Sequence, residues 1–130
     1  MATALFAGSA PLCADVIRID SAKLQQLLAN REVVVDIRTP EEWRQTGVIE
    51  GSHLITFFDA DGNHDVLRWM RKLMPIAISD QPVAIVGDGR GRSASVSRYL
   101  HEKIGYWRVY DLHKGIGEWI AEKRPLKPYP

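Results

Sequence analysis

The sequence predicts a single α/β domain, with a sheet of about five mainly parallel strands and helices on both faces. Three observations carry this prediction. Short apolar runs alternate with amphipathic segments of helical period along most of the chain, which is typical of parallel strands joined by helices. A length of 130 residues suits one domain, and an apolar content of 45% supplies its core. No internal repeat or low-complexity segment interrupts the alternation.

The elements follow one another from turn and composition signals. Strands are predicted over residues 16–19 (an edge strand), 32–37, 53–56, 83–86 and 107–110. Helices are predicted from Asp20 or Ser21 to Asn30, from Thr39 to the break at 47–51, over 66–74 before Pro75, from Ser93 to Gly105, and from Gly115 onward.

Two helix starts have specific capping signals. Thr39 is followed by Pro40 and, three residues after the cap, by Glu42, which is the pattern of a capping box with proline in the first turn. Ser93 is a good N-cap for the longest helix. That helix carries Val96, Leu100 and Ile104 on one face, and we expect Trp69 and Trp119 to lie in the core.

The clearest candidate site follows the apolar strand at residues 83–86. A glycine-rich loop comes directly after the strand and leads into a helix. Backbone N–H groups of such a loop, together with the helix dipole, favour a bound anion, and two arginines add positive charge. The candidate anion-binding residues are Gly87, Asp88, Gly89, Arg90, Gly91, Arg92 and Ser93.

Asp36 and Arg38 are candidate supporting residues. They follow a neighbouring strand, and the carboxyl ends of parallel strands meet at one edge of a sheet, where ligands bind. A structural ion pair and direct ligand contact are both open for this pair. Asp88 would repel an anion unless Arg90 or Arg92 neutralises it. Glu41 and Glu42 are interpreted as carboxylates that stabilise a helix N-terminus.

Four segments together resemble the rhodanese family of sulfurtransferases. Residues 36–42 resemble its Asp-x-Arg-x-x-x-Glu signature, and 47–52 resemble its Gly-His-Ile-Pro-Gly-Ala turn. Arg92-Ser93 resembles the Arg-Ser that closes the active loop, and residues 109–119 resemble its C-terminal Gly-Gly-Ile-x-x-Trp motif. The resemblance covers roughly residues 16–125. It implies an α/β fold with the active loop at residues 87–92.

The departures from the family pattern bear on activity. Rhodanese chemistry needs a cysteine thiolate that carries the transferred sulfur, and Gly87 stands at that position. The related phosphatase loop would place its cysteine at Val86. Further departures are Val48 and Glu50 in the turn and Lys114 in the last motif.

The resemblance therefore implies a non-catalytic module that binds a small oxyanion or an anionic group of a protein partner. One alternative is a sulfurtransferase that works with an altered loop or with a cysteine from another chain. A second alternative is a phosphate-handling enzyme that uses Asp88 as its nucleophile.

Other classes of function find little support in the sequence. A net charge of +1 gives no electrostatic case for nucleic acid, and no apolar run reaches the length of a membrane span. The four histidines lack metal-ligand spacing. Asp59-x-Asp61-x-Asn63 begins like a calcium loop, but His64 stands where glycine is needed, so a turn is the simpler interpretation. We expect no metal and no cofactor.

Residues 1–14 are interpreted as a signal-peptide remnant or a flexible tail. They are apolar and rich in small residues, contain the chain's single cysteine, Cys13, and lack a basic start. A signal would make the protein periplasmic or secreted, and a cytoplasmic location is expected otherwise. The domain is predicted over residues 15–125, and 126–130 form a solvated C-terminal tail. The oligomeric state is left open.

Overall fold

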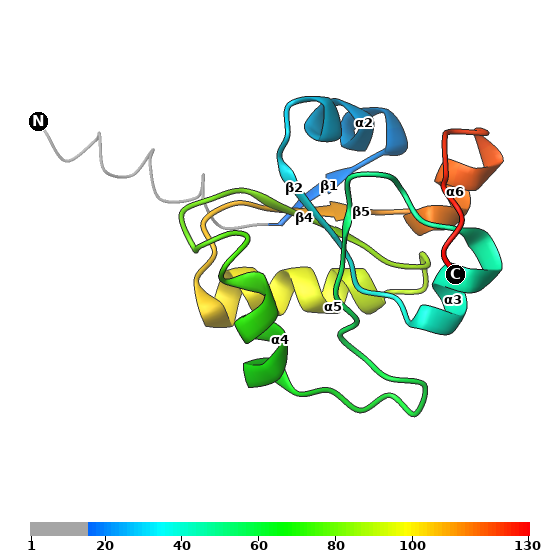
Figure 1. Ribbon diagram of the computed structural model, residues 1–130. Helices are drawn as coiled ribbons and strands as arrows, with labels where there is room; N and C mark the ends of the chain where they lie inside the picture. Colours follow the sequence, from blue (N-terminus) through cyan, green and yellow to red (C-terminus); the bar gives the residue numbers. More distant parts are fainter. Residues whose placement is uncertain (1–15) are drawn as a thin grey trace, which may run out of the picture.

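Five parallel strands form the centre of the protein, which a computed structural model describes over residues 16–130 (Figure 1). The strands are β1 (Ile17–Ile19), β2 (Val33–Asp36), β3 (His53–Leu54), β4 (Val83–Val86) and β5 (Val109–Leu112). Their order in the sheet is β1-β5-β4-β2-β3, and every neighbouring pair is parallel. The predicted fold class is confirmed, with β1 at one edge of the sheet as expected. The predicted segment 1–14, including Cys13, lies outside the described residues.

Helices cover both faces of this sheet. They are α2 (Ser21–Ala29), α3 (Pro40–Thr46), α4 (Val66–Leu73), α5 (Arg92–Tyr99) with its π-helical continuation η2 (Leu100–Ile104), and α6 (Gly115–Ala121). α2 and α6 lie on one face of the sheet, and α4 and α5 on the other (Figure 1). Successive strand residues alternate between the two cores: Val34 packs on the α2 and α6 side, whereas Val35 packs on the α4 and α5 side. Trp69 and Trp119 are buried in these cores, as predicted.

The helix caps are largely as the sequence predicts. The side chain of Asp20 accepts a hydrogen bond from the backbone N–H of Lys23 at 2.8 Å. Thr39 and Glu42 form the expected capping box, with proline in the first turn. Each such cap contributes about 1 kcal/mol to stability.

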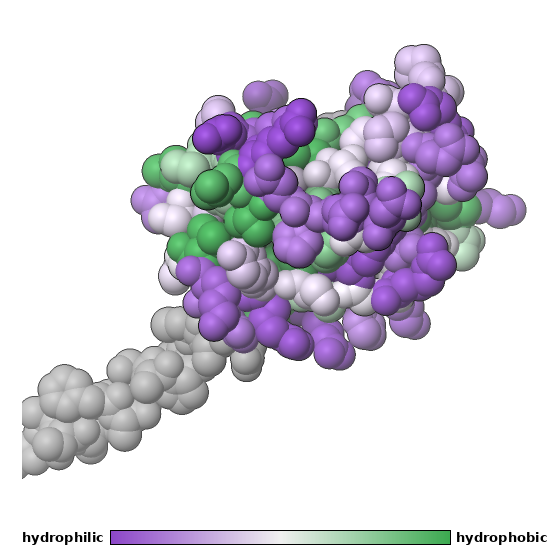
Figure 2. Space-filling model, turned by 90° about the horizontal axis from the view of Figure 1, so that it is seen from below, coloured by the Kyte–Doolittle hydropathy of each residue, from purple (hydrophilic) through white to green (hydrophobic). Residues whose placement is uncertain are grey.

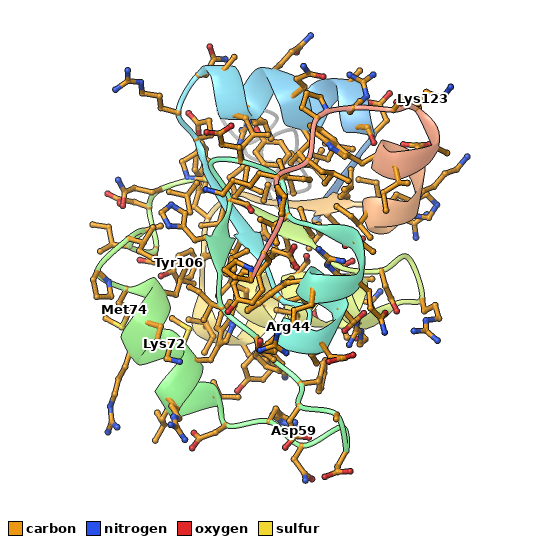
Figure 3. All side chains as sticks on the ribbon, turned by 45° about the vertical axis from the view of Figure 1, so that its right-hand side comes forward. Arg44, Asp59, Lys72, Met74, Tyr106 and Lys123 are labelled. Atoms are coloured by element: carbon orange, nitrogen blue, oxygen red, sulfur yellow. The ribbon has the colours of Figure 1, made fainter. Side chains whose placement is uncertain are left out.

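Three local predictions are wrong. Ser93 is not an N-cap: Gly91 caps α5 in a left-handed conformation, and Ser93 is buried inside the first turn. The last strand begins two residues later than predicted and therefore contains Asp111. The helical period places Met74 on the same side of α4 as Met70 and Leu73, but Met74 is 54% exposed at the end of that helix (Figure 3).

The C-terminal residues are not a freely solvated tail. Val48 and Lys127 exchange two backbone hydrogen bonds, at 2.9 and 2.8 Å. The ring of Tyr129 packs edge-on against that of Trp43, with 5.3 Å between centroids. The segment after α6 therefore closes against α3 and the residues that follow it.

The calcium-like segment is a turn. The Oδ1 atom of Asp59, in the loop at the bottom of Figure 3, accepts hydrogen bonds from the backbone N–H groups of Asp61 and Asn63. Within residues 16–130, no group of histidine, cysteine and acidic side chains is arranged to hold a metal ion. No helix in the same range has both the length and the apolar character that crossing a bilayer requires.

Apolar side chains also reach the surface on the face that carries α4 and α5. Figure 2 shows them as separate patches among polar side chains. Exposed apolar residues of these elements are Leu67, Met74 and Tyr99.

Gly115 fixes the contact between the start of α6 and the loop after β4. Its backbone is left-handed, with φ of +66°. A Cβ atom there would lie 2.3 Å from the backbone nitrogen of Gly89 and 2.6 Å from the carbonyl carbon of Asp88. The backbone N–H of Ile116 donates to the carbonyl of Gly87 at 2.9 Å. Residues 115 and 116 therefore hold the loop against the end of β5.

This contact predicts opposite effects for two glycines of one helix. Gly115→Ala should lower the free energy of unfolding by about 2–5 kcal/mol, because the added Cβ meets backbone atoms and φ is positive. Gly117→Ala is the matched control, since a Cβ there meets nothing within 4 Å; it should raise stability by about 0.5–1 kcal/mol. Urea unfolding of both variants measures the difference. Equal effects would contradict the close approach of residues 89 and 115.

Candidate functional site

The predicted site residues meet at the carboxyl edge of the sheet. Asp36 is the last residue of β2, and Gly87 follows the last residue of the neighbouring β4. The loop of residues 87–92 then leads into α5. The structure thus brings together the loop and the two supporting residues, Asp36 and Arg38.

Asp36 and Arg38 form a buried structural ion pair. Arg38 donates from Nε and Nη2 to the carboxylate of Asp36 at 2.8 to 3.2 Å. Its other contacts are to Thr46 Oγ1 at 2.9 Å and to the carbonyl of Gly47 at 3.2 Å. Both charged side chains are 1% exposed. Of the two roles open from the sequence, the structural one is therefore what the pair performs here: it joins the end of β2 to the end of α3.

Asp88 is neutralised within the loop. Its carboxylate accepts from the backbone N–H of Arg90 at 3.0 Å and from the Arg90 Nε at 2.6 Å. The side chain of Arg90 is 82% exposed, whereas that of Asp88 is 12% exposed. Burial raises the pKa of Asp88, but these hydrogen bonds and the charges of Arg90 and Arg92 outweigh it and hold the pKa below its usual value. The guanidinium of Arg90 therefore faces the solvent, whereas the carboxylate of Asp88 is largely covered.

Arg92 is held by a carboxylate from α3. Its Nη2 atom donates to both oxygens of Glu42, at 2.9 and 2.7 Å, and lies 3.4 Å from Asp88 Oδ2. Burial raises the pKa of Glu42, but hydrogen bonds from Arg92 and Thr39 lower it by more. The pKa of Glu42 therefore lies below its usual value. The Nε atom of Arg92 is buried and has no hydrogen-bond partner among residues 16–130.

Gly87 occupies a position with little free space. A Cβ atom on it would lie 3.0 Å from the Cβ of Ser93, 3.3 Å from its backbone nitrogen and 3.4 Å from its hydroxyl oxygen. Ser93 cannot easily move away, because its hydroxyl donates to Asp111 Oδ1 at 2.6 Å inside the protein. The first turn of α5 therefore packs directly against the glycine.

The loop retains unpaired backbone donors. The N–H groups of Gly89, Gly91 and Arg92 donate to no acceptor in the described part of the chain. Gly89 and Gly91 both have positive φ, 89° and 101°, and the N–H group of Arg90 between them donates to Asp88. Chemically, this arrangement offers hydrogen bonds to an anion but no nucleophilic side chain at residue 87.

Two contacts of the candidate site are not predicted from the sequence. Glu42 was interpreted as a helix-terminal carboxylate, and no local signal shows its pairing with Arg92, 50 residues away. The partner of Ser93, Asp111, was placed just outside the last strand. An acidic residue between Tyr110 and Leu112 in an apolar run is a signal that could have identified it.

Comparisons with known proteins identify the domain family and the fold. The sequence pattern of the rhodanese-like domain matches residues 20–122. A comparison with curated proteins gives no match. Among solved structures, the protein is similar to the polysulfide-sulfur transferase homodimer from Wolinella succinogenes, at 19% identity and a TM-score of 0.68, over 98% of this chain and 90% of that one.

Two further structures are similar. A rhodanese-related protein from Thermoplasma volcanium has 25% identity and a TM-score of 0.64, over 87% of this chain and 99% of that one. A rhodanese-like domain from Anabaena sp. has 16% identity and a TM-score of 0.67, over 86% and 79%. Identities this low show likeness of fold, but the matched domain pattern spans most of the chain, and the chain therefore belongs to the rhodanese-like domain family.

Proposed function

We propose that this protein is a non-catalytic rhodanese-like module whose 87–92 loop binds an anionic group. The main observation behind the proposal is that residue 87 is a glycine with little space for a side chain. It has no side chain, and the space for one is limited by Ser93, which is itself anchored on Asp111. The chain has no thiol at residue 87 to carry a persulfide. The first turn of α5 packs close to the glycine that stands there.

The remaining parts of the loop favour binding. Unpaired N–H groups at residues 89, 91 and 92 are suited to the oxygens of an anion. The exposed guanidinium of Arg90 is the first charge that an incoming anion meets. The buried Nε of Arg92 lacks an acceptor, and such a donor costs about 1–3 kcal/mol while it stays unpaired.

Two carboxylates moderate this affinity. Asp88 and Glu42 balance Arg90 and Arg92, so the four side chains carry no net charge together. An inorganic oxyanion therefore gains little long-range attraction. A carboxylate or phosphate on a protein partner has further contacts to add, so a partner-borne anionic group is favoured over a free ion.

The catalytic alternative is tested by sulfur transfer from thiosulfate to cyanide. We expect the full chain and its Cys13→Ala variant to show no turnover above the uncatalysed rate. Turnover of about 1 s⁻¹ or more, the range of ordinary enzymes, would contradict the non-catalytic proposal. Loss of that turnover in Cys13→Ala would then assign the chemistry to Cys13.

Gly87→Cys tests whether the missing thiol alone separates this loop from an active one. We expect a protein destabilised by about 1–3 kcal/mol, because the new Cβ crowds Ser93, with only weak sulfur transfer, because Asp88 disfavours both a thiolate and thiosulfate nearby. Thermal unfolding and the same assay provide the measurements. Full stability together with rapid turnover would show that the space beside residue 87 is not restricted.

Anion binding is tested by following the amide resonances of residues 87–93. Sulfate, phosphate, thiosulfate and a glutamate-rich hexapeptide are the four probes. Asp88→Asn should tighten binding about tenfold, which corresponds to about 1.4 kcal/mol, because it removes a negative charge from the loop. Asp80→Asn changes the net charge equally but lies just before β4, at the opposite edge of the sheet, and should have no effect.

The probes separate the two sources of the anion. Shifts with the inorganic ions indicate a small oxyanion, and shifts with the peptide alone indicate a protein partner. No shift with any probe, or equal effects of the two aspartate variants, would overturn the proposed site.

A further inference from the structure

A pocket lies beside the edge strand β1 and is lined by none of the charged residues of the 87–92 loop. It has a volume of about 310 Å³ and lies between β1, β5 and the helix formed by α5 and η2. Its lining consists of Val16, Arg18, Ala94, Arg98, Glu102 and Asp111. Arg18 and Asp111 are direct neighbours in the parallel register of β1 and β5, so both side chains leave the sheet on the same face.

Asp111 is an unusual residue for the middle of a strand. It is 3% exposed, between the buried residues Tyr110 and Leu112. One oxygen, Oδ1, accepts the hydroxyl of Ser93 at 2.6 Å. The other oxygen accepts no hydrogen bond within residues 16–130. This second oxygen is not fully buried, so it can accept a hydrogen bond from a group that enters the pocket.

The other charged groups of the pocket are also unpaired. Arg18, Arg98 and Glu102 form no ion pair in the described residues. Arg98 and Glu102 have the spacing that ordinarily brings opposite charges together on an α-helix. Here the helix widens into the π-helical turn at Leu100–Ile104 between them, and such turns are frequent at functional sites.

We propose that this pocket binds a small zwitterion of the α-amino acid class. The pocket contains two cations, Arg18 and Arg98, and two anions, Glu102 and Asp111. A ligand with a single charge would be repelled by one of these pairs. A ligand with both an ammonium and a carboxylate group can bind both pairs. The ammonium would bind Asp111 and Glu102, and the carboxylate would bind the guanidinium groups of Arg18 and Arg98. A pocket volume of about 310 Å³ accommodates an amino acid with a short side chain beside Val16 and Ala94.

The test uses the full chain and four probes. L-Alanine and L-methionine carry both charges, while propionate and propylamine carry one each. We expect the amino acids to shift the amide resonances of the lining residues, and each singly charged probe to bind at least tenfold more weakly. Absence of these shifts at tens of millimolar amino acid, or equal binding of a singly charged probe, would overturn the proposal.

Three variants separate binding from folding. Asp111→Asn retains the volume of the side chain and an acceptor for Ser93, and it should weaken amino-acid binding about ten- to a hundredfold, because a charge-assisted hydrogen bond is lost. Arg98→Gln alters an exposed side chain and should weaken binding by about tenfold without altering the fold. Arg71→Gln on α4 makes the same charge change outside the pocket and should leave affinity unchanged. Unchanged affinity in Arg98→Gln, or an equal loss in Arg71→Gln, would contradict the assignment whether or not Asp111→Asn folds.

Discussion

The buried ion pair of Asp36 and Arg38 is the interaction on which the carboxyl edge of the sheet depends. Arg38 uses its remaining donors on Thr46 and Gly47 and so fixes α3 to the end of β2. α3 in turn presents Glu42 to Arg92. Removing one member of a buried pair costs about 3–5 kcal/mol, because the other charge is left unpaired. The position of the 87–92 loop is therefore determined partly by residues some fifty positions earlier in the chain.

The same edge determines which groups the 87–92 loop offers to a ligand. In a cysteine-containing loop, unpaired N–H groups and a helix N-terminus lower the pKa of a thiol. Here these donors remain, but Gly87 provides no thiol, and Asp88 supplies a negative charge within the loop. Ser93 packs against Gly87, and its hydroxyl donates a hydrogen bond to Asp111 in strand β5. The arrangement combines unpaired backbone N–H groups with side chains whose charges balance.

Sequence reasoning predicted most of what depends on local pattern. The alternation of strands and helices, the capping box at Thr39 and the pairing of Asp88 with an arginine all follow from nearby residues. What it could not predict depends on tertiary packing. Ser93 is a good N-cap by residue type, but burial beside Asp111 uses its hydroxyl, and Gly91 caps the helix instead. The contact between Arg92 and Glu42 and the packing of Tyr129 on Trp43 join distant segments without a local signal.

We propose that the 87–92 loop binds an anion through its backbone although residue 87 carries no nucleophile. Anomalous diffraction from crystals of the full chain grown with selenate tests it most directly, because selenium locates the anion without ambiguity. We expect an anomalous peak for a selenate ion whose oxygens lie about 3 Å from the backbone nitrogens of residues 89, 91 and 92. A loop without such a peak, with Arg90 still paired to Asp88, would show that the loop is not an anion site.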